Sequence, residues 1–391
     1  MTQLLNTART KVATTTAPLR KRLEPVGNVL GLKPVKYPLR TVGVLLLYAL
    51  PILNLPVITT TGSDFSGVLF TVTAYALVAL GLNIVIGYAG LLDLGYVGFY
   101  AVGAYTVGVL TTEHGNWPFF LVLPVAIGVT ALSGIILGAP TLRVRGDYLA
   151  IVTMGFGEII RIIARNTPWL GGSGGINQIP APPDIGPNGE GIFRIPHLTW
   201  QNGYPQYNGQ STGFLDFGVI DATPFYWLVL TALIVVIVAD RLIKNSRVGR
   251  AWEATREDED AAEIMGVPTF KFKLLAFALG ASIGGLAGAI FATRQGFINP
   301  PSFPLMLSML FVAAVVIGGA GNRWGAIIGG VIVAYLPERF REFSDWRLLV
   351  FGLVLIVIVS FRPDGLFPGK AKRRAKEAVA EAEKLEEAPS A

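Results

Sequence analysis

The sequence predicts an all-α, polytopic membrane protein with about ten transmembrane helices. Of its 391 residues, 52% are hydrophobic and only 15% are charged, whereas a soluble domain usually carries about 25% charged residues. The apolar residues gather into stretches of about 20, the length that crosses the hydrocarbon core. Lysine and arginine lie beside these stretches in a pattern that assigns an orientation.

Some apolar stretches are long and nearly free of charge, whereas others are short, interrupted by proline or charged. The clearest predicted spans are residues 68–88, 118–139, 224–239, 274–293, 304–320 and 347–361. The weaker predicted spans are residues 41–60, 96–112, 147–165 and 325–337. Roughly eight or nine spans remain possible, because the ten-span arrangement places the arginine-rich residues 338–347 outside.

The distribution of basic residues predicts that both termini are cytoplasmic. A basic tail, 1–40, precedes the predicted membrane domain, 41–361, and a second tail, 362–391, follows it. The predicted inside loop 241–273 is rich in lysine and arginine, whereas the predicted outside loop 166–222 is mildly acidic. Cytoplasmic loops of membrane proteins carry the excess of these two residues.

The predicted outside loop is rich in glycine, proline and asparagine, which predicts turns and irregular structure. It is too long for a simple connection, and it is either a docking surface or a tolerated insertion.

Glycines recur at four-residue spacing inside the spans, as at Gly280, Gly284 and Gly288. This spacing predicts close helix packing rather than a binding site. A short internal sequence repeat also relates Val85-Ile-Gly-Tyr-Ala-Gly90 to Val316-Ile-Gly-Gly-Ala-Gly321, each at the predicted inner end of a span.

The residue inventory disfavours most enzymes and cofactor sites. The chain has no cysteine and only two histidines, His114 and His197, far apart in sequence, so thiolate chemistry and His-rich metal sites are excluded. It lacks the Gly-x-x-x-x-Gly-Lys-Ser/Thr motif that cradles nucleotide phosphates. The net charge is +6. The excess positive residues lie at the N-terminus and beside apolar segments, where they indicate membrane topology, so no nucleic-acid partner is expected. We therefore expect no catalytic residue, metal or cofactor in this chain.

The inside loop contains a predicted helix. Residues 251–265 hold neither glycine nor proline and predict one helix of about four turns. Gly266 is well placed as its C-terminal cap and Pro268 as its stop. A narrow apolar stripe runs along it, made of Ala251, Ala254, Ala261 and Met265. The helix either docks into a groove of a partner or packs at the interface on its own chain.

Glu158 and Arg161 lie three residues apart on the predicted span 147–165, close enough to pair on one face. Charged residues inside a span are functional candidates by default. The alternative is that the outer part of this span is exposed to water and the pair only fixes a packing register.

Several stretches fit one known family when they are taken together. The loop reads Ser246-Arg-Val-Gly-Arg-Ala-Trp-Glu-Ala-Thr-Arg256-Glu257-x-x-x-Ala261-Ala262-x-x-x-Gly266, and the other stretches are 81–95, 145–161 and 318–325. The loop resembles the EAA-type coupling loop of ABC importer permeases. The whole set resembles the LivM-type permeases of branched-chain amino acid importers, from about residue 70 to about residue 365.

The resemblance implies a permease in the bacterial inner (cytoplasmic) membrane, surrounded by lipid. It implies three kinds of protein partner: a homologous permease, two cytoplasmic ABC ATPase subunits and an extracytoplasmic binding protein. ATP and Mg²⁺ would then bind to the ATPase subunits. The coupling element pushed by those subunits would comprise Arg256, Glu257, Ala261, Ala262 and Gly266.

Branched-chain amino acids are the favoured cargo, because residues 148–158 are more similar to the amino-acid branch than to urea importers. Urea or another small polar solute is the alternative. An ion-coupled secondary transporter is a more distant one, since such proteins ordinarily show ionisable residues in several spans. A membrane enzyme would need a catalytic constellation.

Overall fold

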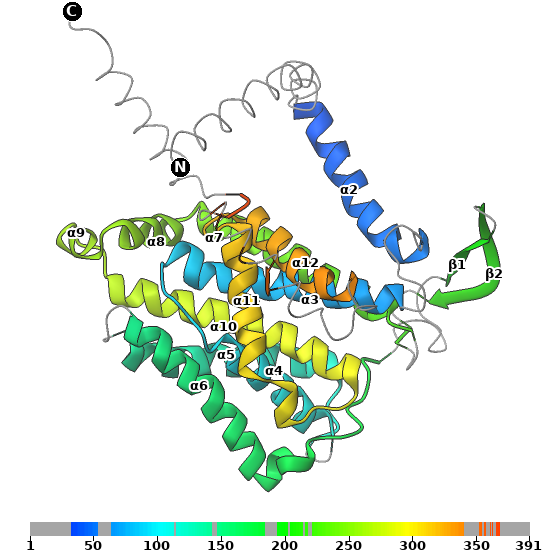
Figure 1. The fold of residues 1–391 in the computed structure, drawn as a ribbon, viewed down its shortest axis with the longest axis horizontal. Helices are drawn as coiled ribbons and strands as arrows, with labels where there is room; N and C mark the ends of the chain where they lie inside the picture. Colours follow the sequence, from blue (N-terminus) through cyan, green and yellow to red (C-terminus); the bar gives the residue numbers. More distant parts are fainter. Residues whose placement is uncertain are drawn as a thin grey trace, which may run out of the picture. The chain divides into compact units, whose positions relative to one another are not determined.

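The computed structural model describes most of the chain between residues 33 and 339. The described residues are 33–53, 64–112, 115–142, 147–183, 194–201, 204–213, 216–217, 221–339, 352–353, 356, 360, 362 and 365–367. The chain divides into two compact units, Met1–Leu55 with Leu198–Gln206 and Pro56–His197 with Tyr207–Ala391. The smaller unit includes α2 (Lys33–Leu53), and the larger unit contains the helical bundle drawn in Figure 1.

Five described helical segments are long and apolar enough to cross a membrane. They are α3 with its π-helical extension η1 (Phe65–Leu82, Asn83–Tyr88), α5 (Phe119–Thr141), α7 (Thr223–Lys244), α10 (Thr269–Gln295), and η5 with α11 (Pro300–Ser302, Leu305–Gly318). The other helices of the bundle are α4 (Tyr96–Thr111), α6 (Asp147–Asn166), α8 (Arg247–Glu257), α9 (Glu259–Ile264) and α12 (Arg323–Arg339). The predicted helical membrane architecture is therefore confirmed, with the two-stranded sheet described below as its exception.

The predicted spans coincide with these helices where the structure describes them. Each of the clear spans from 68–88 to 304–320 falls on one of the five long apolar segments. The weaker spans fall on α2, α4, α6 and α12. The span predicted at 347–361 lies almost wholly outside the described residues, as do most of the two tails.

α10 lies inside the bundle, packed against α3, α4 and α5 (Figure 1). Its glycines permit this close approach, because a Cβ atom at Gly288 would overlap the carbonyl oxygen of Tyr100 on α4. The hydroxyl of Tyr96 donates a hydrogen bond of 2.6 Å to the carbonyl oxygen of Gly280, and the Tyr96 ring also lies against Gly284. The predicted packing role of these glycines is confirmed, since small residues let helix backbones approach in lipid.

The segment predicted as an irregular outside loop contains a two-stranded sheet, so that prediction was incomplete. Turns η2 (Pro168–Leu170) and η3 (Gly172–Gly174) fit it, but β1 (Arg194–Gln201) and β2 (Tyr204–Gly213) do not. The overlooked signal is the dipeptide Asn202-Gly203 between the two strands, which is typical of hairpin turns.

Candidate functional site

The loop between α7 and α10 forms two short helices, α8 and α9, at one end of the bundle (Figure 1). The single helix predicted over 251–265 is wrong, because the chain leaves the helical conformation at Asp258 (φ −153°, ψ 111°). The Asp258 side chain accepts a hydrogen bond of 2.9 Å from the N–H of Ala261 and caps α9. Glu259 and Asp260 then occupy the first turn of α9, where negative charge stabilises a helix.

α9 ends at Ile264, and Gly266 closes its C-terminal end, as predicted. The N–H of Gly266 donates to the carbonyl of Glu263 at 2.9 Å, and the N–H of Val267 donates to the carbonyl of Ala262 at 3.0 Å. These are the two bonds of a Schellman motif. The φ angle of Gly266 is +84°, a left-handed conformation that glycine adopts without the steric cost of a Cβ atom.

α8 is held to the bundle by Trp252. This side chain is fully buried, and its Nε1 donates a hydrogen bond of 2.7 Å to the carbonyl of Phe272 on α10. Its ring stacks on Tyr88 of η1, with centroids 6.4 Å apart and planes 17° apart. Because Trp252 touches both α10 and η1, α8 cannot move without disturbing these two elements.

Arg256 reaches from α8 to the last residues of η1 and to the turn that follows it. Its Nη1 donates a hydrogen bond to the carbonyl of Gly87. A Cβ atom at Gly90 would lie 3.0 Å from Arg256 Cγ, and one at Gly321 would lie 2.7 Å from Arg256 Nη1. Partial burial lowers the pKa of the Arg256 guanidinium, and the nearby Glu253 opposes this shift, so the group stays protonated. Arg256 is thus a second anchor of α8.

Arg256 lies where the two copies of the internal sequence repeat, residues 85–90 and 316–321, come together. The N–H of Gly321 donates a hydrogen bond of 2.9 Å to Oδ1 of Asn83. Nζ of Lys244 donates to the carbonyl of Gly321 at 2.9 Å and lies 4.4 Å from the centroid of the Tyr88 ring. We call Asn83, Gly87, Tyr88, Lys244 and Gly321 the glycine junction. It joins the ends of η1, α7 and α11.

A buried carboxylate supports the junction. Asp240 on α7 is 2% exposed. Its Oδ2 accepts a hydrogen bond of 3.3 Å from the Tyr88 hydroxyl and lies 3.2 Å from Nε of Arg323 on α12. Arg323 and the Tyr88 hydroxyl thus both contact Oδ2 of this buried carboxylate, and such contacts offset part of the cost of burying it.

The predicted coupling residues fall on two sides of the α8–α9 loop. Arg256 contacts the bundle and Ala262 is buried, whereas Glu257, Ala261 and Gly266 are exposed.

The predicted apolar stripe is not one face. Ala251 is buried, whereas Ala254 on the same helix is exposed, and Ala261 and Met265 beyond the break at Asp258 are exposed as well. Ile264, which is 85% exposed beside Met265 at 83%, is not among the predicted site residues. Neither is Trp252, because the partners that make it an anchor are distant in sequence.

Glu158 and Arg161 form an ion pair on α6. Nε of Arg161 donates to Oε2 of Glu158 at 3.0 Å, and Nη2 donates to Oε1. The side chains of Arg161 and Glu158 are 31% and 41% exposed. The geometry is bidentate, which is the stronger arrangement for an arginine and a carboxylate.

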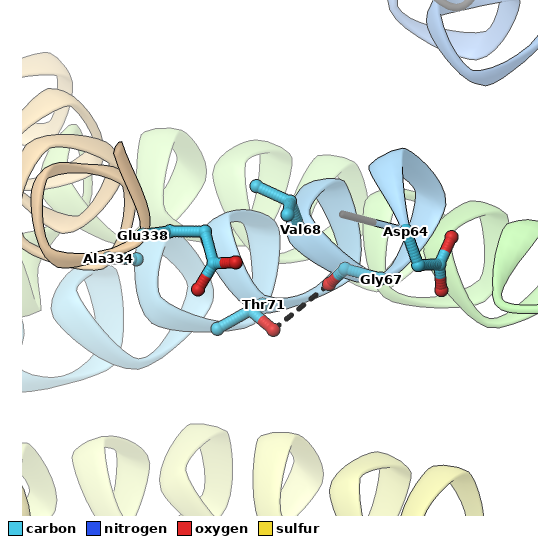
Figure 2. Close-up of a pocket in the computed structure, with 6 residues that line it drawn as sticks. All are labelled: Asp64, Gly67, Val68, Thr71, Ala334 and Glu338. Carbon is cyan, nitrogen blue, oxygen red and sulfur yellow. Dashed lines mark hydrogen bonds between the residues drawn. The ribbon is translucent and has the colours of Figure 1, made fainter. Parts of the chain in front are cut away.

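A pocket of about 240 Å³ lies at the other end of α3, beside α12 (Figure 2). It is lined by Asp64, Gly67, Val68, Thr71, Ala334 and Glu338. Within it the hydroxyl of Thr71 donates a hydrogen bond of 3.0 Å to the carbonyl of Gly67. Its lining thus offers carboxylates and small polar groups.

Comparison with known proteins decides the family. Residues 65–359 match the family described as "Branched-chain amino acid transport system / permease component". The chain belongs to this family. It is therefore a transport subunit and a multi-pass membrane protein.

Individual relatives agree with this membership. The "High-affinity branched-chain amino acid transport system permease protein LivM" of Salmonella typhimurium is 41% identical over 301 residues, which cover 75% of this chain and 68% of the relative. The protein of the same name from Escherichia coli is 40% identical over 297 residues, with the same coverage of 75% and 68%. A probable LivM permease of Methanocaldococcus jannaschii is 26% identical over 345 residues, covering 76% and 91%. No solved structure matches the chain.

Proposed function

We propose that this chain is the permease subunit of an ATP-driven importer in the bacterial inner membrane. Its cargo is branched-chain amino acids, delivered by an extracytoplasmic binding protein. The observation that carries the proposal is the family match over residues 65–359, together with 41% identity to a branched-chain amino acid permease. In this assembly the chain pairs with a homologous permease and with two ABC ATPase subunits.

The charge pattern supports about ten spans, two cytoplasmic termini and a cytoplasmic α8–α9 loop. Lys244, Arg247 and Arg250 lie at the junction of α7 and α8, and Lys271 and Lys273 lie in the first turns of α10. The loop is therefore flanked on both sides by the basic residues that mark cytoplasmic ends of membrane helices.

The two sides of the α8–α9 loop suit a coupling element. Ile264 and Met265 have the largest exposed fractions among the exposed large hydrophobic side chains of the described residues. Ala261, on the same short helix, and Glu257, at the end of α8, are also exposed. An ATPase subunit that covers this tip would bury apolar surface and gain free energy from it. Gly266 ends the helix at this contact.

A push on the tip has a route into the membrane helices. α8 transmits it through Trp252 to η1 and α10, and through Arg256 to the glycine junction. The junction contains the end of η1, and π-helical segments occur often at functional sites. Nucleotide hydrolysis takes place on the ATPase subunits, which bind ATP and Mg²⁺, while this chain needs no cofactor of its own.

The first test is initial-rate uptake of labelled leucine in cells that lack this gene and then regain it. Uptake should return with the gene, ignore excess unlabelled urea and stop when ATP is depleted. Unchanged leucine uptake with a loss of labelled urea transport would overturn the cargo and keep the permease class. Uptake that ignores ATP depletion and collapses under an ionophore would instead support a secondary transporter.

A further inference from the structure

α6 is packed on one side only. Figure 1 shows it at the edge of the bundle, and its described neighbours include α4, α5 and α11. The side that faces them contains Thr153 and Gly157, where the Thr153 hydroxyl accepts a hydrogen bond of 3.1 Å from the N–H of Leu94 and Gly157 lies against Gly95. The opposite side of the helix is left uncovered by the rest of the described chain.

The uncovered side of α6 is aliphatic. We call it the outer face of α6, and its exposed members are Tyr148, Ile151, Val152, Gly155, Ile159, Ile162 and Ile163. A Cβ atom at Gly155 would meet nothing within 4 Å. Gly155 therefore leaves a shallow gap among the isoleucines, one turn before Glu158.

The ion pair of Glu158 and Arg161 borders this outer face. Glu158 lies roughly 16 Å along a helix that is about 30 Å long, so the pair is near the middle of α6. Both side chains are partly exposed and each is the hydrogen-bonding partner of the other. An opposite pair of charges thus stands beside aliphatic side chains at the middle of this helix.

The neighbouring helix α5 shows what a lipid-facing surface looks like in this protein. Its exposed large residues include Leu121, Leu132 and Ile136, and it has no charged residue along its length. α5 is among the five segments apolar enough to span a membrane, whereas α6 is not. Because charges in lipid are costly and usually face a cavity or another chain, the outer face of α6 needs a more polar neighbour than lipid.

We propose that the outer face of α6 lines the solute pathway, and that Glu158 and Arg161 bind the two charges of a zwitterionic amino acid. This inference rests on the proposed function and deepens it. The Glu158 carboxylate meets the ammonium group of the solute, and the Arg161 guanidinium meets its carboxylate. The isoleucines and the gap at Gly155 receive the branched aliphatic side chain.

The ion pair of Glu158 and Arg161 is compatible with a zwitterionic solute both before and after the solute binds. Without solute, Glu158 and Arg161 neutralise each other, so no unpaired charge is left in the membrane. A zwitterion carries one charge of each sign, so it exchanges partners with the pair without changing the net charge of the site. The pocket of Figure 2 lacks this property, because its six lining residues include two carboxylates and no cation.

The natural absence of cysteine from the chain permits a direct test. Single variants Gly155→Cys and Ile159→Cys on α6 are compared with Leu132→Cys and Ile136→Cys on α5, each in the assembled importer. A charged, water-soluble thiol reagent is supplied on both sides of the membrane. The α6 thiols should react at least tenfold faster than the α5 thiols, and leucine should slow the reaction. Equal rates on the two helices would overturn the placement of α6.

A second measurement separates binding from packing. Glu158→Gln and Arg161→Gln should each raise the KM for leucine at least tenfold while the amount of assembled importer stays normal, and Leu132→Gln on α5 serves as the matched control. Variants that keep KM within twofold of the wild type would overturn the binding role. The difference in thiol rate between α6 and α5 does not depend on which solute is transported, whereas its slowing by leucine does. A wild type that fails to transport leucine would therefore overturn the proposed function, and the difference between the two helices would still test the placement of α6.

Discussion

α8 and α9 are adjacent in sequence, yet they make opposite kinds of contact. α8 buries Trp252 and Thr255, and its Arg256 donates a hydrogen bond to the carbonyl of Gly87 in η1. α9 buries only Ala262 and exposes Ile264 and Met265. In the function proposed above, α8 is the part fixed to the helical bundle and α9 presents the exposed apolar tip. A coupling element needs both parts. Its exposed tip must be accessible to the ATPase subunit, and its anchored helix must pass the resulting movement on to the membrane helices.

The two helices are nevertheless linked to the same framework. Asp258 caps α9 directly after α8 ends, and Glu259 of α9 forms an ion pair with Lys273 of α10. The tip of α9 is therefore exposed without being detached from the bundle.

The variant expected to break this arrangement most strongly is Gly266→Pro. Proline cannot adopt the φ of +84° found here, and it removes the N–H that bonds to Glu263. A cost of about 3 kcal/mol or more corresponds to a loss of roughly 100-fold in ATP-dependent leucine uptake. Uptake is measured alongside the amount of chain in the membrane, which should stay normal.

The matched control is Gly266→Asn, because asparagine tolerates the left-handed conformation. It should keep most of the uptake. Normal uptake by Gly266→Pro would show that the end of α9 plays no part in transport.

The next largest effect is expected at the fixed helix. Arg256→Gln removes a charged hydrogen bond to Gly87, worth about 1.5–3 kcal/mol, and should lower leucine uptake roughly tenfold or more. The ATPase should still co-purify with the permease, because α9 is unchanged. Arg250→Gln, at an exposed position of the same helix, is the control. Loss of ATPase binding in Arg256→Gln would contradict the division between the two helices.

The sequence predicts the parts of this site that depend on local rules. Apolar runs predict the spans, because a membrane helix must be apolar along its length, and Gly266 is predicted because a helix end often requires a left-handed residue. The break at Asp258 was missed although Glu257-Asp258-Glu259-Asp260 concentrates acids that favour a helix start. The direction of Arg256 could not be predicted, because its partner Gly87 is 169 residues away.

Substitutions at the exposed tip of α9 should weaken ATPase binding, whereas the substitution on α8 should leave it unchanged. Replacing both Ile264→Ser and Met265→Ser should weaken ATPase binding about tenfold, because the contact loses buried apolar area. The permease itself should keep its stability, since substitutions at such exposed positions usually change it by about 0.5 kcal/mol or less. Affinity is measured by titrating the purified ATPase, with Glu263→Gln, an exposed position on α9, as the control. Unchanged affinity would remove the tip from the interface.

The smallest effect is expected where the two helices meet. Asp258→Ala removes the cap of α9, which costs about 1 kcal/mol, so uptake should fall roughly fivefold. Asp258→Ser should restore most of it, because serine is also a good cap. A serine variant as weak as the alanine variant would indicate that Asp258 acts through its charge instead.

The most direct measurement of coupling through α9 is a cross-link from its tip. Met265→Cys and, as a control, Glu253→Cys at an exposed position on α8 are the only thiols in their chains. A short bifunctional reagent is applied to membranes that contain the whole importer, with and without ATP. Met265→Cys should cross-link to the ATPase subunit in a yield that changes with ATP, and Glu253→Cys should do so far less. Equal yields from both positions, or no cross-link from Met265→Cys, would contradict it.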